Sequence, residues 1–134
     1  ANLNGGLKQI IIEPGRYVVA DAGVTVSEVI LSAQRGAQRW IYLDVGKFGG
    51  LAETIDEAIR YRMATSYNGV KTTETVVAGP TCDSCDVLYE KNVYQLPAML
   101  KAGDRVRILS TGAYTTTYAS NGFNGLPPLR EFYV

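Results

Sequence analysis

The sequence predicts a mainly β fold, a Greek-key-like β-barrel or sandwich with one or two short helices. Short apolar or alternating runs recur along the chain, as expected for strands that are buried on one or both faces. Turn signals rich in Gly, Pro and Asn separate these runs. No linker and no internal repeat divides the 134 residues, a length that suits a single hydrophobic core.

About eight short strands are expected among nine candidate runs that turn residues separate. The runs lie at 8–12, 17–20, 24–31, 40–44, 63–68, 72–78, 94–96, 105–109 and 129–134. A short helix is expected over 51–61, because Leu51, Ile55 and Ile59 share one face. For most of the charged residues of this helix, the pattern predicts a solvated face.

Composition excludes several classes of function. Formal net charge is zero, so the basic excess typical of a nucleic-acid-binding protein is lacking. No apolar run reaches the roughly 20 residues of a membrane span, and the first residues do not form a signal peptide, so we predict a cytoplasmic protein. Histidine does not occur, which excludes Ser-His-Asp and Cys-His catalysis.

The stretch 79–86, Gly-Pro-Thr-Cys-Asp-Ser-Cys-Asp, places two thiols and two carboxylates directly after an apolar run. Three interpretations compete: a redox or metal Cys-x-x-Cys pair, a reactive Cys82–Asp83 pair, or a turn that merely contains cysteine. Zinc needs about four ligands, and the chain offers neither histidine nor a second cysteine pair. We therefore predict no metal site.

Four separated strings together carry a family resemblance: Glu13-Pro14-Gly15-Arg16, Gly79-Pro80-Thr81-Cys82-Asp83, Gly112-Ala113-Tyr114-Thr115 and Phe123-Asn124-Gly125. In this order and spacing they resemble the C-terminal third of the fold-III pyridoxal-phosphate decarboxylases of ornithine, or of lysine and ornithine. Diaminopimelate decarboxylases are similar too. The strings around Cys82 and Phe123 favour the ornithine side.

The resemblance implies residues that hold pyridoxal 5'-phosphate. Glu13 would keep the ring nitrogen protonated, so that the ring can accept electrons. Arg16 would bind the phosphate through its planar cation, and Tyr114 would donate its hydroxyl to the same phosphate.

It also implies residues that meet the amino-acid substrate. Cys82 would help return a proton to the α-carbon, and Asp83 would bind the distal ammonium, both reaching across a homodimer interface. Phe48 and Phe123 would line the shared site. A further acid, best aligned at Glu57 with Asp56 as the neighbouring choice, would hold the far amine. The family requires no second thiol, so Cys85 is expected to be a small buried residue.

The resemblance divides the chain at residue 16. Residues 1–16 match the end of a preceding TIM-type barrel, and 17–134 match the C-terminal β-barrel domain. The lysine that binds the cofactor covalently belongs to that barrel, so we expect the chain alone to be inactive. The family also completes this domain with a strand from upstream residues, which predicts an open sheet edge and self-association here.

Two classes of function remain open at this stage. The chain is either part of an ornithine or lysine decarboxylase, or an isolated non-catalytic β-domain that serves as a folding module or regulatory homologue. Ornithine and lysine differ by one methylene, which a pocket separates by only about 1 to 3 kcal/mol.

Overall fold

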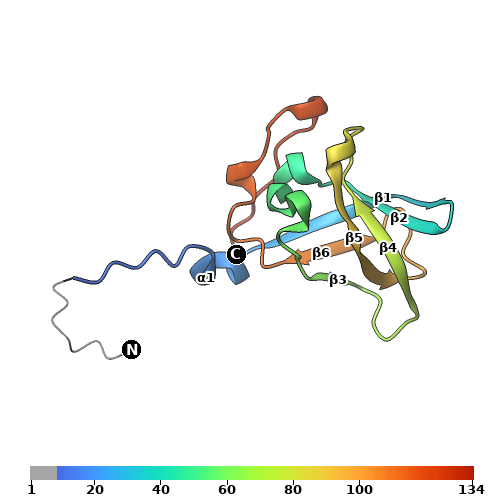
Figure 1. The fold of residues 1–134 in the computed structure, drawn as a ribbon, viewed down its shortest axis with the longest axis horizontal. Helices are drawn as coiled ribbons and strands as arrows, with labels where there is room; N and C mark the ends of the chain where they lie inside the picture. The colour runs from blue at the N-terminus through green and yellow to red at the C-terminus, as the bar shows by residue number, and fades with distance from the viewer. Residues whose placement is uncertain (1–8) are drawn as a thin grey trace.

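The computed structural model describes residues 9–134 and contains one six-stranded sheet with short helical segments (Figure 1). The strands are β1 (Val24–Arg35), β2 (Gln38–Leu43), β3 (Met63–Thr65), β4 (Thr72–Ala78), β5 (Val87–Pro97) and β6 (Arg105–Leu109). The helical segments are α1 (Arg16–Val19), η1 (Ala20–Ala22), η2 (Lys47–Leu51), η3 (Ala52–Glu57), η4 (Ser84–Asp86), η5 (Thr116–Tyr118) and η6 (Phe123–Gly125). The predicted mainly β class is confirmed. Within the described range, no helix has the length and apolar character to cross a membrane.

The sheet has the order β3-β6-β1-β2-β4-β5 and curls into a half-barrel. Strand β1 makes the curl possible, because its first half pairs with β6 and its second half pairs with β2. The register shifts between Val29 and Leu31, where the strand changes partner. All neighbouring strands are antiparallel except β2 and β4, which are parallel.

The concave face of the sheet holds the main core. Alternate residues of each strand point into it, as the period of two requires. Its fully buried members include Val29, Ile41, Leu43, Val77, Leu88, Tyr89, Val106 and Ile108. Leu51 and Tyr61, from the chain between β2 and β3, close the core on its open side.

The segment 58–61 ties β5, one edge strand of the sheet, to the chain entering β3, the other edge strand. Arg60 donates to the carbonyls of Asn92 and Val93, and its guanidinium lies 4.0 Å from the ring centre of Tyr94. The Tyr94 hydroxyl donates to the carbonyl of Tyr61. The side chains of Arg60 and Tyr94 therefore connect β5 to the chain that enters β3.

Several predicted elements differ from the structure. Residues 17–20 lie in the helical turns α1 and η1, not in a strand, because the chain turns at Gly15, whose φ is 50°. Residues 129–134 form no strand, and neither do residues 9–12, whereas Lys8 lies outside the described residues. The helix expected over 51–61 is broken at Ile55 and Asp56, which have non-helical dihedral angles. Strand β5 is far longer than the predicted 94–96.

Candidate functional site

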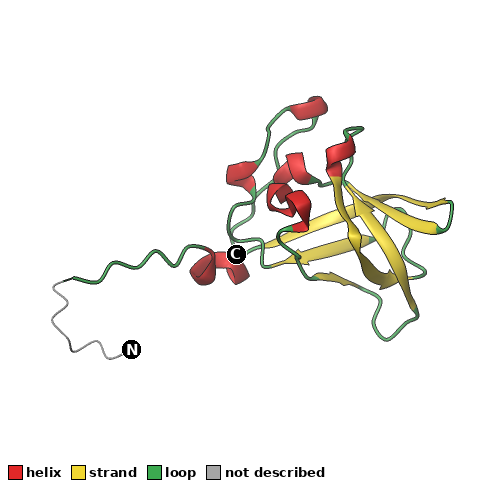
Figure 2. Cartoon of the chain, in the orientation of Figure 1, coloured by secondary structure: helices red, strands yellow, loops and turns green. Residues whose placement is uncertain are grey.

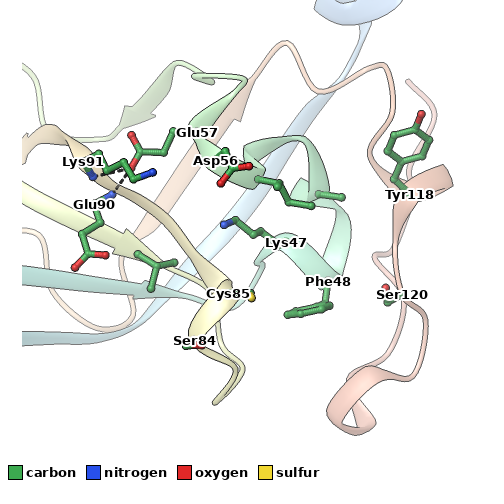
Figure 3. Close-up of a pocket in the computed structure, with 13 residues that line it drawn as sticks. Lys47, Phe48, Asp56, Glu57, Ser84, Cys85, Glu90, Lys91, Tyr118 and Ser120 are labelled. Carbon is green, nitrogen blue, oxygen red and sulfur yellow. Dashed lines mark hydrogen bonds between the residues drawn. The ribbon is translucent and has the colours of Figure 1, made fainter.

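Most helical segments gather at one end of the half-barrel, where η2, η3, η4 and η5 surround an open cavity (Figures 2 and 3). The cavity has a volume of about 510 Å³. Its walls carry charged, aromatic and thiol side chains: Lys47, Phe48, Ile55, Asp56, Glu57, Cys85, Glu90, Lys91 and Tyr118 are among them. Three of the residues predicted to meet a substrate, Phe48, Asp56 and Glu57, therefore line one cavity.

Asp86 holds residues 79–86, the thiol loop, in place. Its side chain is 2% exposed, and it accepts hydrogen bonds from the backbone N–H of Lys47 at 2.7 Å and from the N–H and hydroxyl of Thr81 at 3.0 and 2.8 Å. The carboxylate occupies the space beside Gly46 and Gly79, where an added Cβ would meet it at 2.2 and 2.5 Å. The thiol loop is thereby fixed to the end of β4 and to the loop after β2.

Within this loop the two cysteines have different surroundings. Cys82 is exposed, and its Sγ lies 3.9 Å from the Nδ2 of Asn124 in η6. Cys85 is exposed and lines the cavity, so the expectation that it is a small buried residue is wrong. The 310 turn η4 carries Cys85 outward, because Asp83 caps that turn by accepting from the Cys85 N–H at 2.8 Å. Residues 9–134 contain no cluster of potential metal ligands.

Phe48 and Phe123 lie together although they are far apart in the sequence. Their rings stack with centroids 4.1 Å apart. The Ser120 N–H donates to the carbonyl of Phe48 at 2.8 Å, which fixes the C-terminal loop to η2. Asn124, which follows Phe123, contacts Cys82. The C-terminal loop therefore contacts both the thiol loop and Phe48, which lines the cavity.

Glu57 is occupied by backbone contacts. One oxygen accepts from the N–H groups of Glu90 and Lys91 at 2.7 and 2.6 Å, and the other accepts from the N–H and Nδ2 of Asn92 at 2.9 and 2.8 Å. Desolvation raises the pKa of Glu57, but these hydrogen bonds outweigh it and lower the pKa from 4.5 to about 2. Glu57 is therefore ionised at neutral pH, and both of its oxygens are bound to β5.

Asp56 differs from its neighbour. It is exposed, lines the cavity, and makes no hydrogen bond or ion pair to any residue from 9 to 134 (Figure 3). Its φ of 53° and that of Glu57, 59°, place both in the left-handed region that non-glycine residues seldom adopt. Tyr114 and Asn124 share this feature. Such conformations gather at functional sites, because the surrounding structure must hold them in place.

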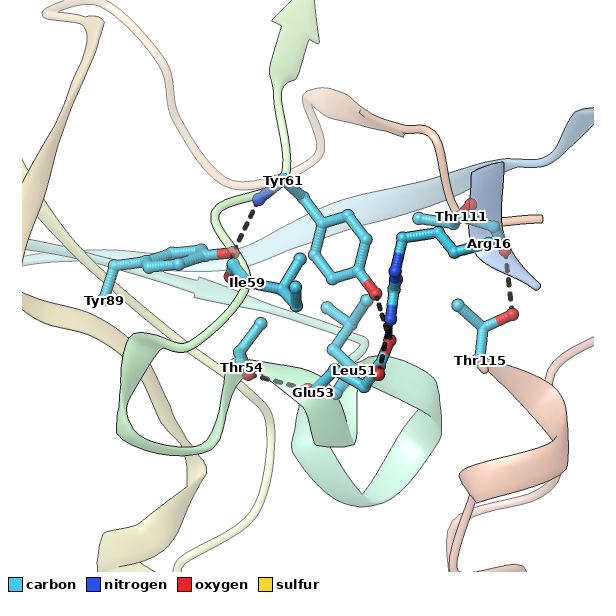
Figure 4. A network of polar contacts seen from close by, with 9 residues as sticks. All are labelled: Arg16, Leu51, Glu53, Thr54, Ile59, Tyr61, Tyr89, Thr111 and Thr115. Carbon is cyan, nitrogen blue, oxygen red and sulfur yellow. Dashed lines mark hydrogen bonds and ion pairs between the residues drawn. The ribbon is translucent and has the colours of Figure 1, made fainter. Parts of the chain in front are cut away.

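A second polar group lies beside the cavity and contains Arg16 (Figure 4). The Nη2 of Arg16 donates to both carboxylate oxygens of Glu53 at 2.5 Å, and the Tyr61 hydroxyl lies 3.5 Å from the same carboxylate. The hydrogen bond to Glu53 raises the pKa of Arg16, and burial raises that of Tyr61. The Arg16 guanidinium also lies 5.2 Å from the ring centre of Tyr114.

The structure therefore brings Arg16 next to Tyr114, whereas Glu13 is exposed in the extended segment before α1. The partners Glu53, Asp86 and Arg60 were not predicted as functional. Glu53, Glu57 and Arg60 do not simply form a solvated face, as the helical pattern suggested, since each has a specific partner. Glycines at both Gly46 and Gly79 are the one sequence signal for the Asp86 contact, since the carboxylate fills the space beside each.

Comparison of this chain with known proteins identifies the family to which it belongs. Residues 16–112 match the model of the pyridoxal-dependent decarboxylase C-terminal sheet domain. The chain is 37% identical over 113 residues to a lysine/ornithine decarboxylase of Selenomonas ruminantium, covering 84% of this chain and 28% of the relative. It is 33% identical over 138 residues to a diaminopimelate decarboxylase of Escherichia coli strain K12, covering 90% and 30%.

Solved structures agree with these sequence matches. A lysine/ornithine decarboxylase from Vibrio vulnificus, complexed with cadaverine, has a TM-score of 0.75 and 37% identity over 85% of this chain and 30% of that one. The chain thus spans less than a third of the length of these relatives. It belongs to the pyridoxal-dependent decarboxylases and contains their C-terminal sheet domain.

Proposed function

We propose that this chain is the C-terminal part of a pyridoxal-phosphate-dependent decarboxylase that acts on a basic amino acid, ornithine or lysine. The observation that carries the proposal is that η3 connects two groups, because its Glu53 pairs with Arg16 and its Asp56 lines the cavity. One is the Arg16–Tyr114 pair, and the other is the cavity that contains Asp56. On this view the chain is inactive alone, and the missing part is a barrel domain with the lysine that binds the cofactor.

The first group fits the phosphate of pyridoxal phosphate. Arg16 supplies a planar cation, and its Nη1 is a buried donor without a hydrogen-bond partner in the described chain. The exposed Tyr114, whose ring centre lies 5.2 Å from the guanidinium, offers a hydroxyl as a second donor. Glu13, three residues before Arg16, would hold a proton at the ring nitrogen. When bound, the cofactor supplies an electron-accepting ring for cleavage of the bond to the carboxyl group.

The second group fits the far amine of the substrate. The only anion of the 56–57 pair with uncommitted oxygens is Asp56, since Glu57 is already bound to β5. We therefore assign the distal ammonium to Asp56 in place of Glu57. Phe48 provides an apolar wall for the methylene chain.

The thiol loop would serve the proton transfer. Cys82 is exposed, as a thiol that delivers a proton to the substrate α-carbon must be, and Asp83 follows it at the cap of η4. In the proposed homodimer both residues reach the partner's site, and the Phe48–Phe123 stack lies next to that interface.

The test joins this chain to the barrel domain of the Selenomonas ruminantium relative and measures CO2 release. With pyridoxal phosphate, the wild-type assembly should release CO2 from ornithine or lysine, and Cys82→Ala should lower kcat about 100-fold or more. Turnover by the 134-residue chain alone would contradict the proposal, as would an assembly that binds the cofactor but decarboxylates neither amino acid. Preference for diaminopimelate would overturn the substrate assignment alone.

A further inference from the structure

Strand β5 carries an outward bulge that borders the cavity. Thr75 of β4 pairs with Tyr94, and Val77 pairs with Tyr89, so the four residues 90–93 lie opposite Val76 alone. Such an excess cannot continue the ladder, and the backbone groups of the bulge need other partners. Two members of the bulge, Glu90 and Lys91, form part of the cavity wall.

Two side chains from the broken helical segment satisfy the bulge. Glu57 accepts from the N–H groups of residues 90, 91 and 92, and Arg60 donates to the carbonyls of Asn92 and Val93 at the other end. Arg60 also lies over the ring of Tyr94. The carboxylate of Glu57 thus binds the N–H groups of the bulge, and the guanidinium of Arg60 binds its carbonyl groups. We call Glu57 and Arg60 the bulge clamp.

The clamp acts on the same turn that presents Asp56. Glu57 follows Asp56 directly, and both have left-handed dihedral angles that cost free energy unless neighbouring contacts hold them. Figure 3 shows Glu57 directed at the bulge, whereas Asp56 faces the cavity near Lys47. The clamp therefore fixes the position of Asp56 and also the position of the cavity wall that Glu90 and Lys91 form.

We propose that Glu57 and Arg60 are positioning residues that set how long a basic amino acid the site accepts. This inference rests on the proposed decarboxylase function. The span between the bulge and Asp56 determines where a distal ammonium can bind. A change of one methylene in fit alters kcat/KM by at least about tenfold. A clamp of this kind acts on substrate length without touching the substrate.

The test uses Glu57→Gln, which keeps the size of the side chain but turns one acceptor into a donor that faces backbone N–H groups. Arg60→Lys removes the fork and keeps the charge. Glu74→Gln, an exposed residue of β4, is the matched control. In the active assembly, we expect each clamp variant to change the ratio of kcat/KM for lysine to that for ornithine by about tenfold. The control should leave the ratio unchanged. General destabilisation would also leave the ratio unchanged, because it lowers kcat/KM for lysine and for ornithine together.

A second measurement needs only the 134-residue chain. Amide hydrogen exchange at residues 90–92 should accelerate about tenfold or more in Glu57→Gln, while exchange at Val77 and Leu88 in the core stays the same. Unchanged exchange at the bulge, or faster exchange with an unchanged lysine-to-ornithine ratio in an active assembly, would overturn the clamp. An assembly whose wild type decarboxylates neither substrate overturns the proposed function instead.

Discussion

Two carboxylates, Asp86 and Glu57, bind backbone N–H groups in different ways. Asp86 is buried, lies against two glycines and joins the thiol loop to the loop after β2. Glu57 lies near the surface and holds a single bulge of β5. Because buried donors without partners cost more than donors that water can reach, Asp86 should determine whether the fold forms. Glu57 should determine the shape of the site.

The largest effect is expected for Asp86→Ala. It leaves the N–H groups of Lys47 and Thr81 without their acceptor and opens a cavity beside two glycines. The loss in unfolding free energy should be about 3 kcal/mol or more. Urea titration followed by circular dichroism measures it. A loss below about 1 kcal/mol would show that Asp86 does not hold these loops.

Gly79→Ala tests the same site from the other side. An alanine Cβ would meet the Asp86 carboxylate at 2.5 Å, so the loop must shift or the carboxylate must leave its donors. We expect a loss of about 1 to 3 kcal/mol in urea titration. The control is Gly49→Ala, because neither Gly49 nor Gly79 has a positive φ and an alanine Cβ at Gly49 would lie 3.3 Å from the Cγ2 of Val45, its nearest neighbour. Equal losses at both positions would attribute the effect to the loss of a glycine in general and not to the contact with the carboxylate.

Glu57→Gln should cost about 1 to 3 kcal/mol at pH 7, the range for lost hydrogen bonds to a charged group. The pKa of Glu57 is depressed from 4.5 to about 2 in the folded protein, so its contribution is complete above pH 4.5. The contribution is lost as pH falls from 4.5 through 2. The stability difference between wild type and variant should therefore shrink between pH 5 and pH 2, and a constant difference would contradict the assignment.

The smallest effect on stability is expected for Asp56→Asn. Asp56 makes no hydrogen bond or ion pair within residues 9–134, and asparagine tolerates the left-handed conformation as well as aspartate does. The change in unfolding free energy should stay within about 0.5 kcal/mol. In the active assembly, the same variant should raise KM for lysine and ornithine. A large loss of stability would assign Asp56 to the fold and not to the substrate.

Part of this site could be predicted from the sequence. Apolar alternation gave the strands at 24–31, 72–78 and 105–109, and the thiol string placed Cys82 on a loop after a strand. The broken helical segment was not predictable from its apolar spacing, because its left-handed residues are held by contacts with a distant bulge. The functional difference between Asp56 and Glu57 has the same origin. The sequence cannot distinguish two adjacent acids, because only the folded chain shows that β5 donates hydrogen bonds to Glu57.

The most direct test of this account is the titration of the Glu57 carboxyl group, followed by its side-chain 13C shift in the 134-residue chain. If Glu57 is committed to the bulge, the midpoint should lie near pH 2, the value that its four hydrogen bonds impose. A midpoint near 4.5, the ordinary value, would show that the carboxylate is free to bind substrate and that the bulge clamp does not exist.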